Sequence, residues 1–162
     1  MVRAFISDEN AVNIQIGYIL NLIVLMIVTG SITSSFYLYT DASSAQAMRV
    51  SYTDLGSQIA RDITNMYLIS ENSQGNVSLN VSRTIPLTMG GKGYRIELKN
   101  ATENSMALID ISEGSFSRNK ISTTLNSIKD PGNTGGVVYS GSGEINIRLM
   151  KNISKAVSLR IE

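Results

Sequence analysis

The residue types that most often carry out catalysis are scarce in this chain. It contains neither cysteine nor histidine, which removes thiol nucleophiles, disulfides, thiolate metal sites, the usual general base and the commonest zinc ligand. An active site could be built only from carboxylates, Lys, Tyr or Ser. The acidic pair Asp110 and Glu113 is flanked by Ser, and such pairs in a β-rich region are usually surface charge. We therefore predict a non-enzymatic protein without a cofactor.

Two short motifs have the composition of ligand-binding loops but not their spacing. Residues 90–93 (GGKG) lack the Walker spacing, the Ser or Thr after Lys, and a following helix. Residues 130–133 (DPGN) lack the acidic spacing and the closing Glu of a calcium loop. We expect a hairpin turn at the first motif and a turn at the second, with no metal site at either.

Four Asn-X-Ser/Thr sequons lie in the last 90 residues of the chain and none precedes them. Their asparagines are Asn76, Asn80, Asn100 and Asn152, which are candidate N-glycosylation sites. Asn76 and Asn80 share the polar face of a predicted strand, so attached sugars would point outward. The sequons favour an extracytoplasmic C-terminal domain.

A long charge-free segment precedes these motifs. Residues 11–39 contain no Asp, Glu, Lys or Arg, and a membrane-spanning helix needs about 20 predominantly apolar residues. A secretory signal has a shorter apolar region of about 7 to 15 residues. A helix buried on all sides in a soluble core would need more apolar chain than the remainder supplies. The sequence therefore predicts a transmembrane helix over residues 12–40.

Polar and small residues within this segment are candidates for helix–helix contact. Side-chain amides are costly in hydrocarbon unless they find a partner. Asn13 and Gln15 could instead lie at the membrane interface, whereas Asn21 lies deeper. Small residues let helix backbones approach closely. The candidate assembly residues are Gln15, Gly17, Asn21, Gly30 and Ser34, with Ser31 and Ser35 in the same small-residue patch.

The helical pattern continues beyond the apolar segment as an amphipathic extension over residues 41–71. Apolar residues recur at steps of three and four, and charged residues occupy other positions. We expect this stripe to pack on the chain's own C-terminal domain, and Gly56 to permit a close approach. The helix should end near Ser70, because residues 71–76 (ENSQGN) are typical of turns. The stripe comprises Met48, Tyr52, Leu55, Ile59, Ile63 and Met66.

The pattern then changes to the alternation that is typical of half-buried strands. Alternating segments occur around residues 77–81, 94–98, 145–149 and 157–161, and residues 106–111 and 136–139 are apolar runs that could be strands buried on both faces. Residues 121–125 are a weaker candidate. With no second helical pattern, the sequence predicts an α+β protein whose C-terminal antiparallel sheet or sandwich, residues 72–162, packs on the helix.

The charge balance excludes one class of partner. Fourteen Lys and Arg against thirteen Asp and Glu give a net charge of +1, and no long basic run occurs. Nothing therefore indicates nucleic-acid binding. Residues 1–11 form a short polar leader in which Arg3 is the only basic side chain, so the orientation signal is weak.

Residues 10–20 (NAVNIQIGYIL), followed by the apolar helix, its amphipathic extension and a β domain, resemble an archaeal type IV pilin. The Ile16-Gly17-Tyr18 run looks particularly like uncharacterised pilin-like proteins of haloarchaea. The resemblance covers residues 8 to about 70, and the β domain only in general character.

In that family a prepilin peptidase removes the leader just before the apolar segment. Carried over here, the scissile bond would join Ala11 and Val12, although Asn10 stands where a basic residue is usual. An alternative is the bond between Ala4 and Phe5, which follows Arg3. The sequence leaves both sites open.

The resemblance implies a non-enzymatic cell-surface protein, either a filament subunit or a minor or accessory pilin. Its expected partners are the membrane, copies of itself or other pilin-like subunits, and the prepilin peptidase. The alternative is a permanently anchored single-pass protein whose extracellular β module binds an envelope component or sugar without polymerising. These readings differ in whether the apolar helix self-associates.

Overall fold

The computed structural model describes residues 9–101, 106–114, 119–126, 128, 131–154 and 156–162. The chain divides into two compact units, residues 1–43 and 44–162. One helix begins in the first unit and ends in the second.

Helix α1 (Glu9–Glu71) is 63 residues long. It contains no proline, so no position lacks a backbone donor or forces a kink. The helix ends one residue beyond the predicted end, and Gly75 adopts a φ of 118° in the following turn. The continuous helix predicted from the sequence is confirmed.

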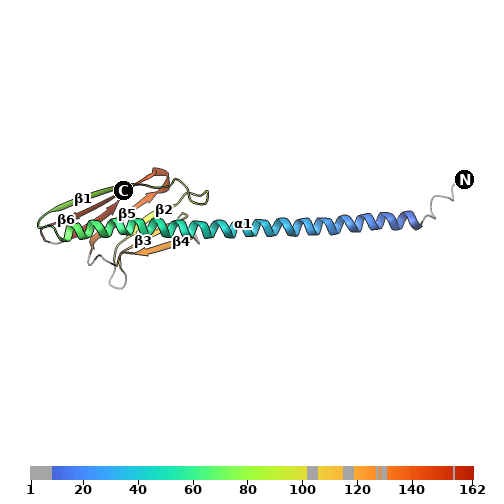
Figure 1. Ribbon diagram of the computed structural model, residues 1–162, viewed down its shortest axis with the longest axis horizontal. Coiled ribbons are helices and arrows are strands. Elements are labelled where there is room, and N and C mark those ends of the chain that lie inside the picture. Colours follow the sequence, from blue (N-terminus) through green and yellow to red (C-terminus); the bar gives the residue numbers. More distant parts are fainter. Residues whose placement is uncertain (1–8, 102–105, 115–118, 127, 129–130, 155) are drawn as a thin grey trace. The chain divides into compact units, whose positions relative to one another are not determined.

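Seven strands follow in a single sheet with the order β1-β6-β7-β5-β2-β3-β4. The sheet lies alongside the C-terminal half of α1 (Figure 1). A 3₁₀ turn, η1 (Ser140–Ser142), joins β5 to β6. All seven predicted strand segments are confirmed. The strands are β1 (Val77–Thr84), β2 (Arg95–Lys99), β3 (Leu108–Ser112), β4 (Lys120–Thr124), β5 (Pro131–Tyr139), β6 (Glu144–Lys151) and β7 (Val157–Ile161).

The sheet is mixed, which corrects the expectation of an antiparallel sheet or sandwich. Strand β7 pairs antiparallel with β6 and parallel with β5. The chain reverses direction once between β5 and β6 and again between β6 and β7, so β7 returns in the direction of β5. Because β7 lies between β5 and β6, two consecutive strands are not neighbours. The alternation of apolar and polar residues predicts where strands lie in the sequence, but it does not predict that β7 pairs between β5 and β6.

The turn predicted at residues 130–133 is also corrected. Asp130 lies outside the described residues, and β5 already begins at Pro131, which pairs with Val157. The strand extends this far because β7 supplies a parallel partner. Further along, Gly136 has a φ of 135°, and a Cβ there would lie 2.1 Å from the backbone oxygen of Ile161. Gly136, the first residue of the predicted apolar run, therefore serves for close strand approach.

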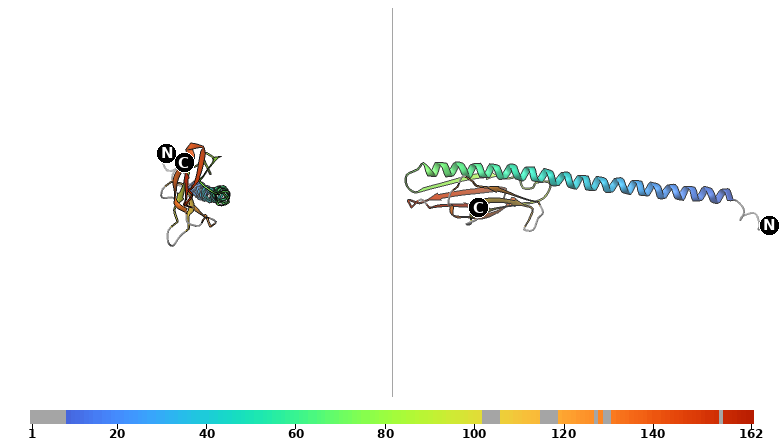
Figure 2. Two further views of the ribbon diagram at one scale, coloured as in Figure 1. Left: turned by 90° about the vertical axis from the view of Figure 1, so that its left-hand side faces the viewer. Right: turned by 90° about the horizontal axis from the view of Figure 1, so that it is seen from below.

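The second half of α1 lies along one face of the sheet (Figure 2). Its apolar stripe is part of the core there, as predicted. All six stripe residues are buried, together with alternate residues of β2, β3, β6 and β7 such as Ile96, Ile109, Ile147 and Leu159. At Gly56 an added Cβ would lie 2.6 Å from Thr123 Oγ1 on β4. The predicted close approach is therefore present, and the core lies between α1 and the sheet.

The two apolar runs of the sequence, residues 106–111 and 136–139, differ in how deeply their strands are buried. Strand β3 is buried on both faces, since Ile109, Asp110 and Ile111 are all nearly inaccessible. In β5, by contrast, Val138 is buried, whereas Val137 and Tyr139 are exposed. The second run therefore belongs to a strand with one open face. We call the face of the sheet opposite α1 the outer face.

Candidate functional site

The candidate site is the surface of the N-terminal half of α1. Among the described residues, α1 is the one helix long and apolar enough to cross a membrane. From Ile14 to Tyr39 every side chain is exposed, and the large apolar ones are 49% to 75% accessible. Such a surface greatly exceeds the apolar patches that soluble monomers leave in water.

Four hydroxyl groups of this segment donate to backbone carbonyls within the helix. Ser31 donates to Ile27 O at 2.8 Å, and Ser35 donates to Ser31 O at 2.9 Å. Thr33 and Thr40 make the same bond to the carbonyl four residues earlier. In hydrocarbon every polar group needs an internal partner. These residues are therefore compatible with lipid despite their polarity.

The amides differ from the hydroxyls. Gln15 and Asn21 are exposed, and neither side chain forms a hydrogen bond to any part of the chain that the structure describes. An unpaired amide loses favourable interactions when it leaves water. In a bilayer, a second helix could supply the missing partner of Asn21.

Helix geometry separates the predicted assembly residues onto different faces. Gly17 and Asn21 are four residues apart and share one face, as do Gly30 and Ser34. The nine residues from Asn21 to Gly30 correspond to about two and a half turns. Asn21 and Gly30 therefore lie on opposite faces, and one straight partner helix cannot contact both. Gln15 lies nearer to the Gly30 side.

The face with Gly17 and Asn21 also includes Ser31 and Ser35, which the sequence analysis did not assign to it. Ser35 lies eighteen residues after Gly17, about five full turns, and Ser31 lies one turn before Ser35. Between Ser31 and Ser35 on one side and Phe36 and Tyr39 on the other is an open groove of about 640 Å³. Val24 and Val28 lie between Asn21 and Ser31 on the same face. We call Gly17, Asn21, Ser31 and Ser35 the small-residue face. Counting positions by turns, rather than by proximity in sequence, would have identified it.

The candidate cleavage residues are only partly described. Ala4 and Phe5 lie outside the described residues. Ala11 and Val12 lie in the first turns of α1, and their side chains lie outside the described part. Both scissile bonds stay predictions.

The four sequon asparagines are all exposed. Asn80 lies on the outer face of β1, as predicted from alternation. Asn76 Oδ1 accepts a hydrogen bond from Ile153 N at 3.0 Å, and Asn100 Oδ1 accepts one from Thr134 Oγ1 at 2.6 Å. The residue that completes the third sequon, Thr102, lies outside the described residues. Glycosylation of these sites stays a prediction.

Asp110 and Glu113, which are close in sequence, have separate partners in the structure. Asp110 is 2% exposed, which corrects its reading as surface charge. Lys99 Nζ and Lys120 Nζ each lie 2.8 Å from Asp110 Oδ2, and Ser122 donates to Oδ1 at 2.6 Å. Glu113 pairs instead with Lys92, at the predicted hairpin turn. The two carboxylates are thus held by different partners.

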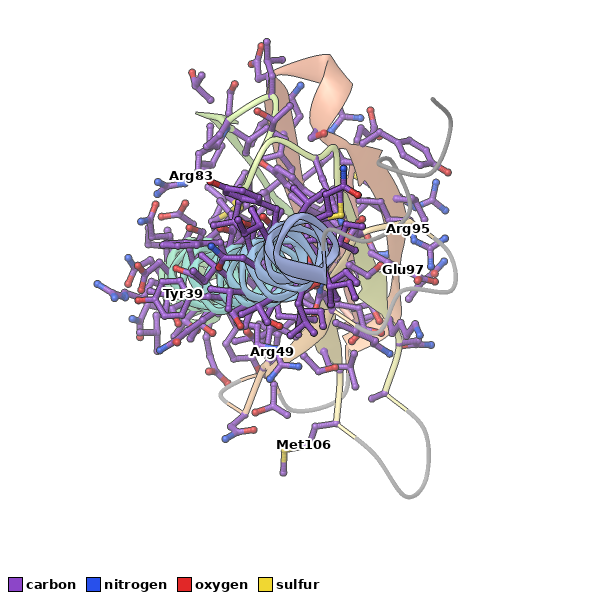
Figure 3. The ribbon with its side chains drawn as sticks, turned by 90° about the vertical axis from the view of Figure 1, so that its right-hand side faces the viewer. Tyr39, Arg49, Arg83, Arg95, Glu97 and Met106 are labelled. Carbon is purple, nitrogen blue, oxygen red and sulfur yellow. The ribbon has the colours of Figure 1, made fainter. Side chains whose placement is uncertain are left out.

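Burial and hydrogen bonding act in opposite directions on Asp110. Burial alone would raise the pKa of its carboxyl, but hydrogen bonds from Lys120, Lys99 and Ser122 outweigh that effect and hold the pKa below its ordinary value. Nearby, Arg95 and Glu97 form a second ion pair at 2.9 Å on the outer face (Figure 3). These groups form a network of opposite charges at that end of the sheet.

Together these features define an α+β protein with one N-terminal apolar helix that could span a membrane. Comparison with known proteins adds no relative, because no protein-family model, no curated protein and no solved structure matches the chain.

Proposed function

We propose that this chain is a type IV pilin-like membrane protein that assembles through its N-terminal helix. The observation that carries the proposal is the charge-free, fully exposed half of α1, which runs without a break into the half that forms the core of the β domain. The resemblance of residues 10–20 to archaeal pilins supports the same reading. The role is structural, as a filament subunit or a minor or accessory subunit.

The proposed topology is a single crossing with the β domain outside the cell. Four hydroxyls of the apolar segment, those of Ser31, Thr33, Ser35 and Thr40, are internally bonded, which favours a lipid environment. The sequon asparagines lie on the exposed surface of the β domain. Prepilin peptidase would act on the leader from the cytoplasmic side of the same helix.

Protease added to intact cells tests this topology. We expect the β domain to be trimmed from outside, while residues 12–40 stay protected in the membrane. Resistance in intact cells, followed by digestion after lysis, would show that the domain faces the cytoplasm.

Assembly is proposed to use the small-residue face. Gly17, Ser31 and Ser35 allow a second helix to approach closely, and a partner copy supplies an interhelical hydrogen bond to Asn21, a contact worth about 0.6 to 2 kcal/mol. The alternative from the sequence, a tethered binding module, leaves this face in contact with lipid alone.

Cysteine cross-linking separates these two functions cleanly, because the chain has no cysteine of its own. Ser31→Cys and Ser35→Cys should give disulfide-linked dimers in membranes. Thr33→Cys is the control, because Thr33 lies two residues from each of these serines and therefore on the opposite side of the helix. Adding Asn21→Leu to Ser35→Cys should reduce cross-linking while membrane insertion is kept or improved.

A lone anchor gives a different pattern. All three cysteine variants would then cross-link equally and only at the rate of random collision, and Asn21→Leu would change nothing. That result, together with a monomer in any sheared surface material, would contradict the assembly proposal and favour the tethered module.

A further inference from the structure

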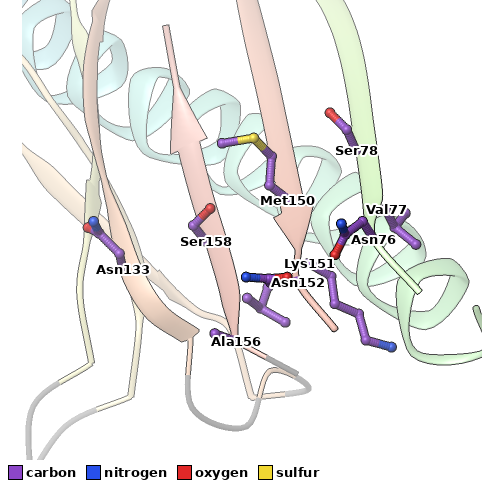
Figure 4. Close-up of a pocket in the computed structure, with 10 residues that line it drawn as sticks. Asn76, Val77, Ser78, Asn133, Met150, Lys151, Asn152, Ala156 and Ser158 are labelled. Carbon is purple, nitrogen blue, oxygen red and sulfur yellow. The ribbon is translucent and has the colours of Figure 1, made fainter. Parts of the chain in front are cut away.

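The outer face carries an open pocket that the proposed assembly does not use. It measures about 640 Å³ and lies where β1, β6 and β7 approach one another (Figure 4). Met150 contributes an apolar surface, 44% exposed, and the surrounding groups are mostly amides and hydroxyls. The polar lining residues are Asn76, Ser78, Asn133, Asn152 and Ser158, together with Lys151, whose Nζ donates to Ser70 O and Ser73 O.

Amides and hydroxyls both donate and accept hydrogen bonds. A ligand that matches this lining must therefore present many groups of both kinds. An exposed Met side chain favours a ligand with an apolar face as well. A sugar ring has this combination, with hydroxyls at its edge and C–H groups on its faces.

Two arginines lie beside the pocket on the same face. Arg148 of β6 is directly opposite Arg160 of β7, one row of the sheet away from Met150 and Ser158, which also face one another. Both arginines are exposed. Neither forms an ion pair with any residue that the structure describes, although Glu144 and Glu162 lie on the same face of these strands.

Like charges directly opposite one another destabilise a sheet. Elsewhere on the outer face the cations are matched, since Lys99 and Lys120 share Asp110, and Arg95 pairs with Glu97. Arg148 and Arg160 therefore differ from these cations, because each of them has no acidic partner among the described residues. Two guanidinium groups at this spacing suit a carboxylate or sulfate, which guanidinium can bind through paired hydrogen bonds.

We propose that this pocket, with Arg148 and Arg160, binds an acidic saccharide, that is, a sugar carrying carboxylate or sulfate groups. The sugar ring lies against Met150 and is hydrogen-bonded by the amides and hydroxyls, and its anionic group lies over the two arginines. Asn76 and Asn152 line the pocket and are also sequon asparagines, so the sugar is either a free polymer or a glycan attached at the rim. This site is independent of whether the N-terminal helix assembles.

The test uses the full chain in lipid nanodiscs, produced without glycosylation, and measures binding of a galacturonic acid tetramer by calorimetry. A neutral galactose tetramer and inorganic sulfate are the comparison probes. We expect the acidic tetramer to bind more tightly than either. Arg148→Gln and Arg160→Gln should each weaken it about tenfold, as for the loss of one charge-assisted hydrogen bond. Met150→Ala should weaken both tetramers and leave sulfate unchanged.

Arg61→Gln is the matched control, because Arg61 is an exposed arginine of α1 and the substitution removes the same charge. An equal loss of binding in this variant would mean that net charge alone is sensed. Equal affinity for the neutral tetramer, or for sulfate, would overturn the acidic or the saccharide part of the proposal. If Arg148→Gln lowers the melting temperature, the arginines serve the fold and the proposal fails.

The two sources of sugar are distinguished by repeating the measurement on chain that carries a glycan at Asn152. Unchanged binding of the acidic tetramer identifies a free polymer as the ligand. Binding that is lost, and restored after enzymatic removal of the glycan, identifies the attached sugar as the occupant. Loss that removal does not restore contradicts the site.

Discussion

The two halves of α1 have similar apolar residues but opposite environments. Ile27 in the first half is 63% exposed, whereas Ile59 in the second is fully buried. In the first half apolar residues occupy nearly the whole circumference of the helix. In the second they are confined to one stripe, and charged residues such as Arg61 lie off it. The distribution of apolar residues around the helix, rather than their number, decides which half packs on the sheet.

Glycines show the same contrast. Gly56 lies against Thr123, and there is no room there for another atom. Around Gly17 and Gly30 nothing lies within 4 Å of an added Cβ. In the second half the close partner is already present in the chain. In the first half, any partner must come from another molecule or from lipid.

The largest contrast should come from placing the same charge in both halves. Ile59→Asp removes a burial worth roughly 1.5 to 3 kcal/mol and leaves a buried carboxylate with a desolvation cost of about several kcal/mol. We expect the β domain to unfold, since small domains have only about 5 to 15 kcal/mol of stability. Thermal unfolding of the full chain in nanodiscs measures this effect.

Ile27→Asp is the comparison variant. The β domain should melt as in the unmodified chain, but membrane insertion should weaken by about 2.5 to 3.5 kcal/mol. If Ile27→Asp destabilises the β domain as much as Ile59→Asp does, the two halves are not independent and the comparison is wrong.

Enlarging a glycine in each half gives a smaller effect. Gly56→Leu should destabilise the β domain by about 1 to 3 kcal/mol, because the added side chain meets Thr123. Gly30→Leu should leave its melting temperature unchanged. The double variant Gly56→Ala and Thr123→Ala should instead recover up to about 1 kcal/mol of helix propensity. Equal melting of Gly56→Leu and the unmodified chain would show that the close approach is not needed.

The smallest expected difference between the two halves is in their response to acid, which should lower the stability of the β domain alone. The folded-state pKa of Asp110 is lowered because hydrogen bonds from Lys120, Lys99 and Ser122 outweigh its burial. Its contribution to stability is complete above the ordinary carboxyl pKa of about 4 and is lost as the pH falls through the folded-state value. Chemical denaturation at several pH values should show this loss, which Asp110→Asn should reduce.

The N-terminal half serves as the internal reference in the same titration. Residues 11–39 contain no carboxylate, so cross-linking of Ser35→Cys samples oxidised at neutral pH after acid treatment should be unchanged. A β domain whose stability does not change between pH 6 and pH 3 would contradict the role assigned to Asp110.

Much of the fold could be predicted from the sequence, because the deciding signals are local. The stripe from Met48 to Met66 and the alternation in β1, β2, β6 and β7 identify which side chains are buried. The position of β7 between β5 and β6 could not be predicted, since every alternating strand carries the same signal whatever its neighbour. Where a turn was expected at residues 130–133, β5 instead begins at Pro131, which could not be predicted because its partner Val157 is distant in sequence.

The candidate sites likewise divide into features with a local signal and features that depend on strand pairing. The apolar segment was evident, and its small-residue face needed only the count of residues per turn. Asp110 was misread because its lysine partners, Lys99 and Lys120, come from two neighbouring strands. The opposition of Arg148 and Arg160 likewise depends on the register between β6 and β7, which neither strand shows by itself.

The end of α1 has a mechanical consequence. Lys151 Nζ, at the end of β6, donates to Ser70 O at 2.6 Å and to Ser73 O at 3.2 Å, so it fastens the last turn of the helix and the residues after it to the sheet. Tension applied along the helix would load the stripe residues together, in shear, while Lys151 resists peeling from the far end. A pull along the second half of α1 would therefore reach the sheet through the whole stripe before the last turn of the helix could unwind.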